Sequence, residues 1–468
     1  MNRKISNVLV IILLSASIYL LPSCGTGDKN LAGKGPGNNL PSEWSTDKNV
    51  RWSYDLGGRG WSSPVIYGNK VFITTAYNET KPPVAQEEQP ERPHQDPPPV
   101  AGGANPQPPR PQGPPHQEEE DTAFKSEVWR CELICLNLKT GKEEWKKVAF
   151  KGNPRTGSHK GNGYASETPV TDGKRIYAYF GMTGLYCYDM KGNLLWQKDL
   201  GAYKTLNSWG TGSSPVVYND IVFQQVDNEE KSFIVALNAL TGDEKWRAAR
   251  DEKTTYATPY IWKNKNRTEL VTTGMSARSY DPETGNLLWE MKTAGEMAIP
   301  SPAGDIDNVY LGNAGGSDGV GSLTSVKAGA TGDITPDTVT LVSSGVEWSR
   351  PDAGTGTPSP VLYNGLIYVL ASNGKSLTSF DASTGKTVYN QKLEKVMGCY
   401  ATPWVYKDNL YITDERGTTS IVKTGAQFEM LSQNKLKDKF WASAALGYDA
   451  YVFKGDKKIY CISALPEK

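Results

Sequence analysis

The chain has 468 residues, and its 51 basic and 51 acidic side chains give a formal net charge of zero. This balance excludes a general electrostatic attraction to nucleic acid. The chain holds 47 glycines, 24 tyrosines and 13 tryptophans. Together with the lack of long amphipathic runs in the sequence, this composition favours strands and turns over helices.

The N-terminus has the pattern of a bacterial export signal. Arg3 and Lys4 precede an apolar run from Val8 to Leu21. At about 14 residues the run is shorter than the roughly 20 that span a bilayer, but it suits the apolar core of a signal peptide. It ends in Leu21-Pro22-Ser23-Cys24, which resembles the lipobox of bacterial lipoproteins. The resemblance implies that residues 1–23 are removed and that Cys24 is lipidated; an ordinary cleaved signal with an incidental cysteine is the alternative.

Residues 24–48 are predicted to be the lipidated cysteine and a flexible tether, because Gly25 to Asn39 is rich in Gly, Asn and Lys. A glycine follows the cysteine, in place of the aspartate associated with retention in the inner membrane. The sequence therefore favours an outer-membrane lipoprotein, facing either the periplasm or the cell exterior.

A repeated segment covers most of the remaining chain. In its clearest part, a strand ends at an Asx residue, a Thr-Gly pair follows in the turn, and a Trp or Tyr comes shortly after the glycine. The Asx and Thr-Gly residues build a tight turn, and the aromatic side chain can fill the wedge between two neighbouring sheets. Copies of the turn, full, shortened or elongated, end at Gly141, Gly192, Gly242, Gly285, Gly332 and Gly385.

A second signature, a small residue and Ser or Thr before Pro, gives the period. Ignoring two insertions, the steps between copies are about 41–46 residues, the size of a four-stranded propeller blade. The prolines are Pro64, Pro169, Pro215, Pro259, Pro302, Pro360 and Pro403, and Trp441-Ala442-Ser443-Ala444 is a degenerate eighth copy. We therefore predict an all-β, eight-bladed propeller of four-stranded antiparallel blades over residues 49–463.

The same pattern predicts how the ring closes. The last blade ends after its third strand, whereas Asn49–Tyr54 carries Trp52 in a fourth-strand context with no strands before it. We expect this N-terminal strand to complete blade eight and cover an open sheet edge.

The repeat resembles that of the quinoprotein, or PQQ-type, propellers, and in particular the BamB-like outer-membrane assembly lipoproteins. That resemblance implies a non-catalytic, monomeric scaffold, held to the membrane by its lipid, that binds another envelope protein and needs no cofactor. The alternative is a PQQ-dependent dehydrogenase, which would hold the quinone with calcium. Asn162, Glu167 and Glu296 are its candidate ligands, but no two cysteines are adjacent as in many such enzymes. A glycan- or peptide-binding propeller is a third hypothesis.

Blade one contains a long insertion, residues 78–126. Its centre is rich in Pro and Glu and is predicted to be extended and disordered, either as a solvated loop or as a partner-binding arm. In an up-and-down blade, loops between second and third strands emerge on the same face as blade-to-blade connections. We call this face the mouth and expect the insertion there.

The aromatic residues that open six of the repeats should also lie at the mouth, where they either pack between blades or form a binding surface. They are Trp61, Tyr164, Trp209, Tyr256, Tyr400 and Trp441. The polar residues expected nearby are Arg59, Asn162, Glu167, Glu296 and Arg350.

The sequence offers no convincing catalytic or metal site. Cys135, Cys187 and Cys461 share one repeat position with alanine and serine, which indicates a small packing slot, and Cys131 and Cys399 are read as free thiols. The three histidines have no zinc spacing. Asp305–Asn308 aligns with hairpin turns, and Gly315–Gly319 lacks the strand-to-helix context of a hydrolase elbow.

Overall fold

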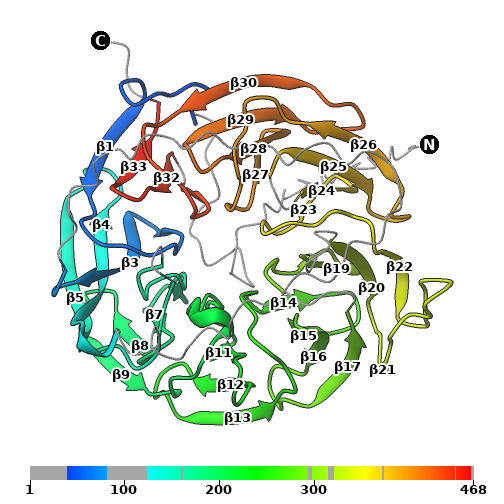
Figure 1. Ribbon diagram of the computed structural model, residues 1–468, viewed down its shortest axis with the longest axis horizontal. Helices are drawn as coiled ribbons and strands as arrows, with labels where there is room; N and C mark the ends of the chain where they lie inside the picture. The colour runs from blue at the N-terminus through cyan, green and yellow to red at the C-terminus, as the bar shows by residue number, and fades with distance from the viewer. Residues whose placement is uncertain are drawn as a thin grey trace, which may run out of the picture.

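The computed structural model describes residues 40–81, 124–159, 162–293, 298–314, 321–371, 374–447 and 449–464. Eight antiparallel sheets of four strands stand around a common centre, and one of them gains a fifth, parallel strand. Figure 1 shows them as a closed ring that runs once around in chain order. This confirms the predicted eight-bladed, all-β propeller.

The first four blades follow the chain from the innermost strand outwards. Blade one holds β2 (Val65–Tyr67), β3 (Lys70–Asn78), β4 (Trp129–Asn137) and β5 (Glu143–Gly152). Blade two holds β6 (Val170–Thr171), β7 (Arg175–Phe180), β8 (Gly184–Asp189) and β9 (Leu194–Lys198). Blade three holds β10 (Val216–Tyr218), β11 (Ile221–Val226), β12 (Phe233–Asn238) and β13 (Glu244–Ala249). Blade four holds β14 (Tyr260–Lys263), β15 (Thr268–Thr272), β16 (Ser276–Tyr280) and β17 (Leu287–Lys292).

The next three blades repeat this order. Blade five holds β18 (Ala303–Gly304), β19 (Asn308–Asn313), β20 (Ser322–Lys327) and β22 (Val346–Arg350). Blade six holds β23 (Val361–Tyr363), β24 (Leu366–Leu370), β25 (Ser376–Asp381) and β26 (Thr387–Lys392). Blade seven holds β27 (Trp404–Tyr406), β28 (Asn409–Thr413), β29 (Thr418–Lys423) and β30 (Met430–Lys435).

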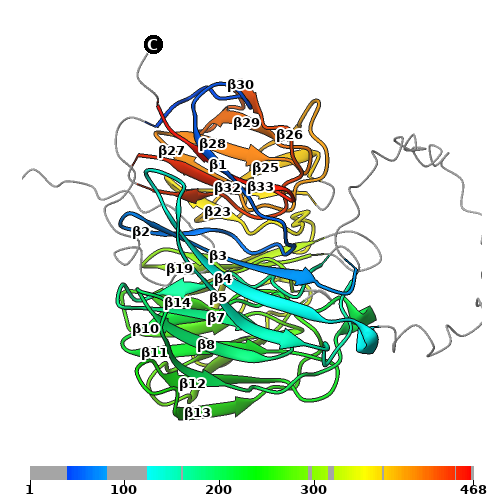
Figure 2. The same ribbon diagram turned by 90° about the vertical axis from the view of Figure 1, so that its left-hand side faces the viewer.

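Blade eight closes the ring as predicted. It joins β31 (Ala445–Leu446), β32 (Tyr451–Lys454) and β33 (Lys458–Ile462) to the N-terminal β1 (Val50–Asp55). β1 pairs antiparallel with β33, with Trp52 opposite Cys461. Figures 1 and 2 both show β1 beside β33. The strand therefore covers an edge that would otherwise be open to pairing with another chain.

Residues just before β1 also pack on the body. Trp44 is buried against Tyr411 and Phe453, at ring-centroid distances of 6.2 and 5.9 Å, and its backbone N–H donates to Asn434 Oδ1 at 2.9 Å. The described part of the predicted tether, from Leu40, is therefore packed against blades seven and eight. Cys24 and the centre of the blade-one insertion lie outside the described residues.

The outer strands dock onto their neighbours through tryptophan. In five interfaces a Trp Nε1 donates to a carbonyl of the third-to-fourth-strand turn in the next blade, at 2.8–3.2 Å. The glycine of that turn has positive φ, and a Cβ on it would lie 2.6–2.7 Å from the indole ring. Only glycine allows this close approach. The Trp–Gly pairs are Trp52–Gly141, Trp145–Gly192, Trp196–Gly242, Trp246–Gly285 and Trp348–Gly385.

Each docking Trp lies opposite a small residue on the third strand. Trp145 pairs with Cys135, Trp196 with Cys187 and Trp246 with Ala236. In blade seven the sizes are reversed, since Ser432 lies opposite Ile421. The cysteine positions are thus the predicted packing slots, sized to the aromatic partner.

Blade five has an elongated connection that reinforces blade four. Within it, β21 (Gly332–Asp333) adds a fifth strand parallel to β17. Ile334 is buried, and Trp289 beneath it is fully buried and donates from Nε1 to Glu269 Oε2 at 2.7 Å. The extra strand therefore takes the place of the docking turn at this interface.

The innermost contacts form a closed ring of hydrogen bonds. The Ser or Thr that opens each first strand donates its backbone N–H to the hydroxyl of its counterpart in the next blade, at 2.9–3.2 Å. The ring returns from blade eight to blade one, and we call it the hydroxyl ring. Its members are Ser63, Thr168, Ser214, Thr258, Ser301, Ser359, Thr402 and Ser443.

Candidate functional site

Three of the six predicted mouth aromatics form one stack. Trp441 lies between Tyr400 and Trp61, with ring centroids 4.1 and 4.3 Å apart and interplanar angles of 12° and 26°. The rings come from blades seven, eight and one, and all three are half-buried. Both faces of Trp441 are occupied, so only Tyr400 and Trp61 at the ends have a face that can meet a partner. The stack therefore joins the connections that lead into three blades, and its rings remain partly exposed.

The other three aromatics are separate from this stack. Tyr164 packs edge-on against Trp129 at 5.0 Å and donates to the Thr156 carbonyl at 3.0 Å. Tyr256 is half-buried, and its buried hydroxyl has no hydrogen-bond partner among the described residues. Trp209 is 38% exposed and follows the 3-10 turn η3 (Leu206–Ser208). Trp209 is therefore the most accessible of the six.

Asn162 and Glu167 hold the loop that carries Trp209. Asn162 is buried, donates from Nδ2 to the Trp209 carbonyl at 3.1 Å and accepts from Ser166 Oγ at 2.6 Å. Glu167 accepts from the Gly181 backbone N–H at 3.2 Å and from Thr211 Oγ1. Burial raises the pKa of Glu167 to about 7. Both polar side chains thus position the loop between blades two and three.

Two other predicted polar residues, Arg59 and Arg350, make their contacts elsewhere in the propeller. The backbone of Arg59 pairs with Ala76 at 2.8 and 2.9 Å. Arg350, at the end of the outer strand β22, forms an ion pair with Asp352 at 2.7 Å and donates to the Gly385 carbonyl at 2.8 Å. Its guanidinium is therefore engaged at the outer part of the interface between blades five and six. Glu296 lies outside the described residues.

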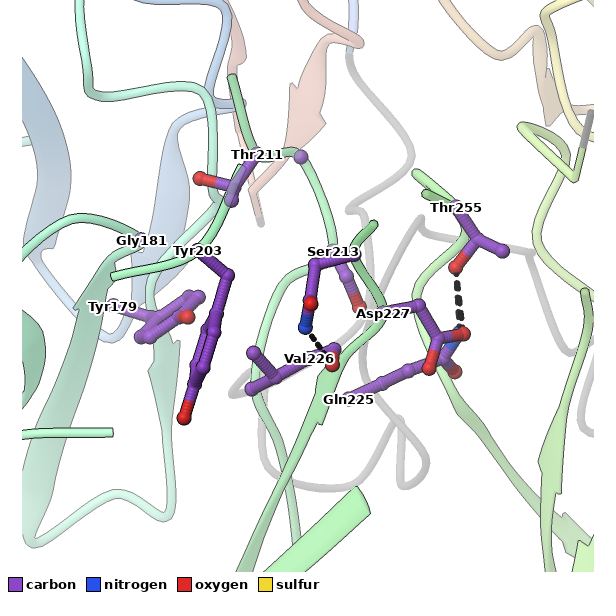
Figure 3. Close-up of a pocket in the computed structure, with 11 residues that line it drawn as sticks. Tyr179, Gly181, Tyr203, Thr211, Ser213, Gln225, Val226, Asp227 and Thr255 are labelled. Carbon is purple, nitrogen blue, oxygen red and sulfur yellow. Dashed lines mark hydrogen bonds between the residues drawn. The ribbon is translucent and has the colours of Figure 1, made fainter. Parts of the chain in front are cut away.

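A small pocket opens beside the Trp209 loop. Its enclosed part has room for roughly one water molecule. Figure 3 shows the rings of Tyr179 and Tyr203 on one wall and Gln225, Asp227 and Thr255 across from them, with Ser213 between. Further lining residues are Gly181, Thr211, Gly212, Val226 and Asn228.

Three of the lining residues have a buried polar side-chain atom with no partner among the described residues. They are Tyr179 Oη, Ser213 Oγ and Gln225 Oε1. Their residues are only 1%, 5% and 1% exposed. Buried polar atoms without a hydrogen bond carry a cost of about 1–3 kcal/mol each, so such a cluster needs a reason.

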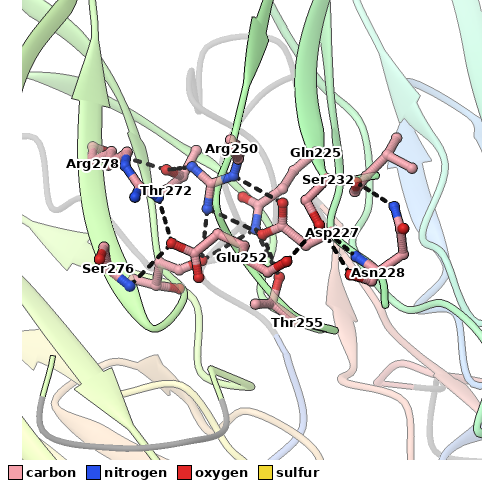
Figure 4. Close-up of polar contacts among 12 residues, drawn as sticks. Gln225, Asp227, Asn228, Ser232, Arg250, Glu252, Thr255, Thr272, Ser276 and Arg278 are labelled. Carbon is pink, nitrogen blue, oxygen red and sulfur yellow. Dashed lines mark hydrogen bonds and ion pairs between the residues drawn. The ribbon is translucent and has the colours of Figure 1, made fainter. Parts of the chain in front are cut away.

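A buried polar network supports the far wall of this pocket. Arg250 and Asp227 form an ion pair at 2.8 Å in which both side chains are fully buried. Gln225 Nε2 donates to Asp227 Oδ2 at 2.7 Å and to Thr255 Oγ1 at 2.8 Å. Figure 4 shows that this network continues to Glu252, which accepts from the Met275 and Ser276 backbone and from Arg278. The wall is therefore rigidly held between blades three and four.

Sequence reasoning did not predict this pocket. Gln224 and Gln225 occur side by side in β11, a strand that is otherwise apolar and fully buried. These two polar residues in a strand of the core were the signal in the sequence that could have indicated the pocket. The contacts that build the pocket join three blades and lie outside the repeated residues, so the repeat could not indicate them.

A buried lysine lies at the interface between blades eight and one. Lys454 is 2% exposed and donates from Nζ to Ser62 Oγ at 2.7 Å and to the Thr74 carbonyl at 2.9 Å. Burial lowers the pKa of this amine to about 7. Lys454 thus links the two blades directly behind the hydroxyl ring.

The described residues do not fit a quinone–calcium centre. They contain no group of three or more His, Cys, Asp or Glu side chains placed to hold a metal ion. The five cysteines they include are free and buried, and burial raises the thiol pKa of each. Asn162 and Glu167, the two candidate ligands in this part of the chain, are bonded to protein groups. No helix among the described residues is long and apolar enough to cross a membrane.

Comparison with known proteins identifies the family. The model described as outer membrane protein assembly factor BamB matches residues 130–260 and 186–426, well over half of the chain. The chain belongs to this family. No curated protein sequence matches the chain.

Solved structures show the same fold as this member of the BamB family. BamB from Moraxella catarrhalis is 13% identical, with a TM-score of 0.50, over 71% of this chain and 91% of that one. Quinohemoprotein alcohol dehydrogenase from Comamonas testosteroni is 11% identical, with a TM-score of 0.55, over 91% of this chain and 80% of that one. At these identities the likeness extends to the propeller and not to activity.

Proposed function

We propose that the protein is a non-catalytic binding module of the bacterial envelope that receives another envelope protein at its mouth. Two observations support this function. The chain belongs to a family described by an outer-membrane assembly factor. Its first 24 residues have the pattern of a lipoprotein signal that would attach Cys24 to the outer membrane.

The aromatic surface of the mouth carries the proposal. Interface hot spots are enriched in Trp and Tyr, because these side chains offer large contact area with little loss of conformational freedom. The stack of Tyr400, Trp441 and Trp61 is pre-ordered by its own packing, and the exposed Trp209 stands on a loop held by Asn162. A partner that covers these rings would therefore bury aromatic area against an already rigid surface.

Site-specific photo-crosslinking in whole cells tests this function. A photoreactive amino acid at Trp209 should capture a discrete envelope protein. The same group at Leu240, which is 65% exposed on a third-to-fourth-strand turn of the opposite face, should not. Trp441→Ala should weaken the Trp209 crosslink, because it removes the centre of the stack. Equal capture from both positions, or none from Trp209, would contradict a partner at the mouth.

A further inference from the structure

A basic surface adjoins the aromatic stack at the mouth. Its lysines lie at the end of β30, along the connection from blade seven to blade eight, and in the loop between β32 and β33. That connection also carries Trp441, the centre of the stack, two residues after one of the lysines. All four side chains are exposed, and they belong to Lys435, Lys437, Lys439 and Lys457.

These lysines outnumber the carboxylates on the same segments. Asp438 is half-buried and accepts hydrogen bonds from the backbone N–H groups of the next residue, of residue 457 and of Lys458, at 2.8–3.2 Å. Lys458 pairs with the carboxylate at the end of β1 at 3.0 Å. Asp456 is exposed, and Glu415 and Arg416 in the next loop add one charge of each sign. The surface therefore carries an excess of positive charge beside half-exposed aromatic rings.

Backbone contacts connect this surface to the base of the blade-one insertion. The Asp456 N–H donates to the Lys439 carbonyl at 2.9 Å, and the Leu56 N–H donates to the Lys457 carbonyl at 2.9 Å. The Tyr77 hydroxyl in turn donates to the Leu56 carbonyl at 2.7 Å. Tyr77 precedes Lys81, the last residue before the segment 82–123, by four positions. The basic surface thus lies close to the point where this segment leaves the propeller.

The segment 82–123 has a composition complementary to that surface. It holds 13 prolines, eight acidic residues and two basic residues, which gives a net charge of −6. Proline-rich sequences with Pro-x-x-Pro spacing bind surfaces lined by aromatic side chains, and Pro106–Pro109 has this spacing. The acidic run Glu118–Asp121 follows a few residues later and offers carboxylates to lysines.

We infer that the aromatic stack and the four lysines form a docking surface for the chain's own segment 82–123. Its 42 residues could extend over roughly 140 Å, so the segment can reach the surface and return to Phe124. Both of its ends are fixed to the same face, which gives an effective concentration of about a millimolar, so weak contacts suffice. The inference goes beyond the proposed function, because it concerns a contact within one chain. An envelope partner that covers the same rings would compete with the segment.

Carbodiimide crosslinking of the purified full-length protein tests the inference, because this reagent joins a lysine amine directly to a neighbouring carboxylate. Peptide mass spectrometry should find Glu118–Asp121 linked to the four lysines at low salt, and these links should weaken in about 1 M salt. Lys204 and Lys231 are the control, since both are exposed lysines at the mouth of blade three. Equal linking of the acidic run to these control lysines would overturn the inference.

Cleavage by a glutamate-specific protease measures docking without a crosslinker. The double variant Lys439→Gln with Lys457→Gln should speed cleavage within Glu118–Glu120 by about threefold or more, because it removes two ionic contacts. Lys204→Gln with Lys231→Gln should leave the rate unchanged. All four lysines are exposed, so neither double variant should lower the melting temperature. Equal cleavage rates in the two double variants would contradict a docked segment.

The aromatic part of the surface needs its own variant. Tyr400→Ala removes one end of the stack and should speed the same cleavage, with the melting temperature as the check on folding. An unchanged rate in a folded Tyr400→Ala variant would exclude the stack from the docking surface and overturn the inference as stated.

A mixture of two isotopically labelled copies decides which chain supplies the segment. Crosslinks from Glu118–Asp121 to the lysines should join peptides of the same label. Crosslinks between different labels would overturn docking within one chain and make this surface an interface between copies. These measurements need no envelope partner, so their failure would leave the Trp209 photo-crosslink standing. Loss of that crosslink with an intact docked segment would overturn only the proposed function.

Discussion

The inner and outer edges of the propeller are held together in different ways. At the inner edge, all eight interfaces use the same contact, a backbone N–H donated to a Ser or Thr hydroxyl. At the outer edge, five interfaces use Trp docking. Of the other three, blade four uses Trp289, which is buried under an extra strand, blade six uses Tyr389, and blade seven uses Ser432.

This difference follows from the space between the blades. Near the axis the first strands converge, so only a short side chain that reaches the next backbone fits. At the circumference the wedge is wide, and several combinations of large and small residues fill it. Ser432 against Ile421 is one such exchange, and β21 over Trp289 is another. Uniform chemistry is needed where the ring is narrowest, and packing volume alone is needed where it is widest.

Removing the outer closure should have the largest effect. Trp52→Ala removes the ring that packs on Gly141 and the hydrogen bond from Nε1 to the Leu138 carbonyl at 2.8 Å. We expect a loss of about 3–5 kcal/mol in the free energy of unfolding, and a larger loss when residues 40–55 are deleted. Chemical denaturation measures both. An unchanged unfolding midpoint in the deletion variant would contradict the role of β1.

The inner edge should also make stability depend on pH. The pKa of Glu167 is raised from 4.5 to about 7, so between these values the folded chain holds a proton that the unfolded chain has lost. Stability from this group is complete below pH 4.5 and is lost as the pH rises to 7. The pKa of Lys454 is lowered from 10.5 to about 7, so its contribution is complete above pH 10.5 and is lost as the pH falls to 7.

These two groups together predict a minimum of stability near pH 7, a few kcal/mol deep. Glu167→Gln should flatten the curve on the acid side, and Lys454→Met should flatten it on the alkaline side. Melting temperatures between pH 5 and pH 10 check both. A wild-type maximum near pH 7 would mean that each group finds a counter-charge in the folded protein.

Gly242 tests the close approach at the outer edge. Its φ is +75°, and an added Cβ would lie 2.7 Å from the Trp196 ring. Gly242→Ala should therefore cost at least about 1–3 kcal/mol in stability. Gly332→Ala is the control, because Gly332 has a φ of +71° with no atom within 4 Å of an added Cβ. If both variants lose the same stability by thermal unfolding, backbone strain alone explains the loss and the docking contact adds nothing.

One member of the hydroxyl ring should show the smallest effect. Thr258→Val keeps the shape of the side chain but leaves the Ser214 N–H without its acceptor at 3.1 Å. We expect a loss of about 1 kcal/mol in the free energy of unfolding, the lower end of the range for a buried donor left without its acceptor. Thr258→Ser retains the hydroxyl and should lose less. Amide hydrogen exchange at Ser214 gives a direct readout, and unchanged protection in Thr258→Val would contradict the ring.

The sequence by itself determined the ring of eight blades and its closure. Each turn that ends in Thr-Gly and each proline of a first strand reports local structure, and the period of these signals counts the blades. The segment around Trp52, which has a fourth-strand pattern with no strands before it, could also be recognised from neighbouring residues alone. The small slots at Cys135 and Cys187 could be read from the repeat because equivalent positions meet equivalent partners.

Only the tertiary structure decided the contacts between unlike positions. The elongated connection of blade five was visible in the sequence, but not that β21 would pair with blade four. The pocket brings together Tyr179, Ser213 and Gln225 from separate strands and loops, and the Asp227–Arg250 pair behind it joins residues that no repeat relates. Periodicity specifies what recurs in every blade, whereas a site depends on what differs between neighbouring blades, and those differences meet only once the ring has closed.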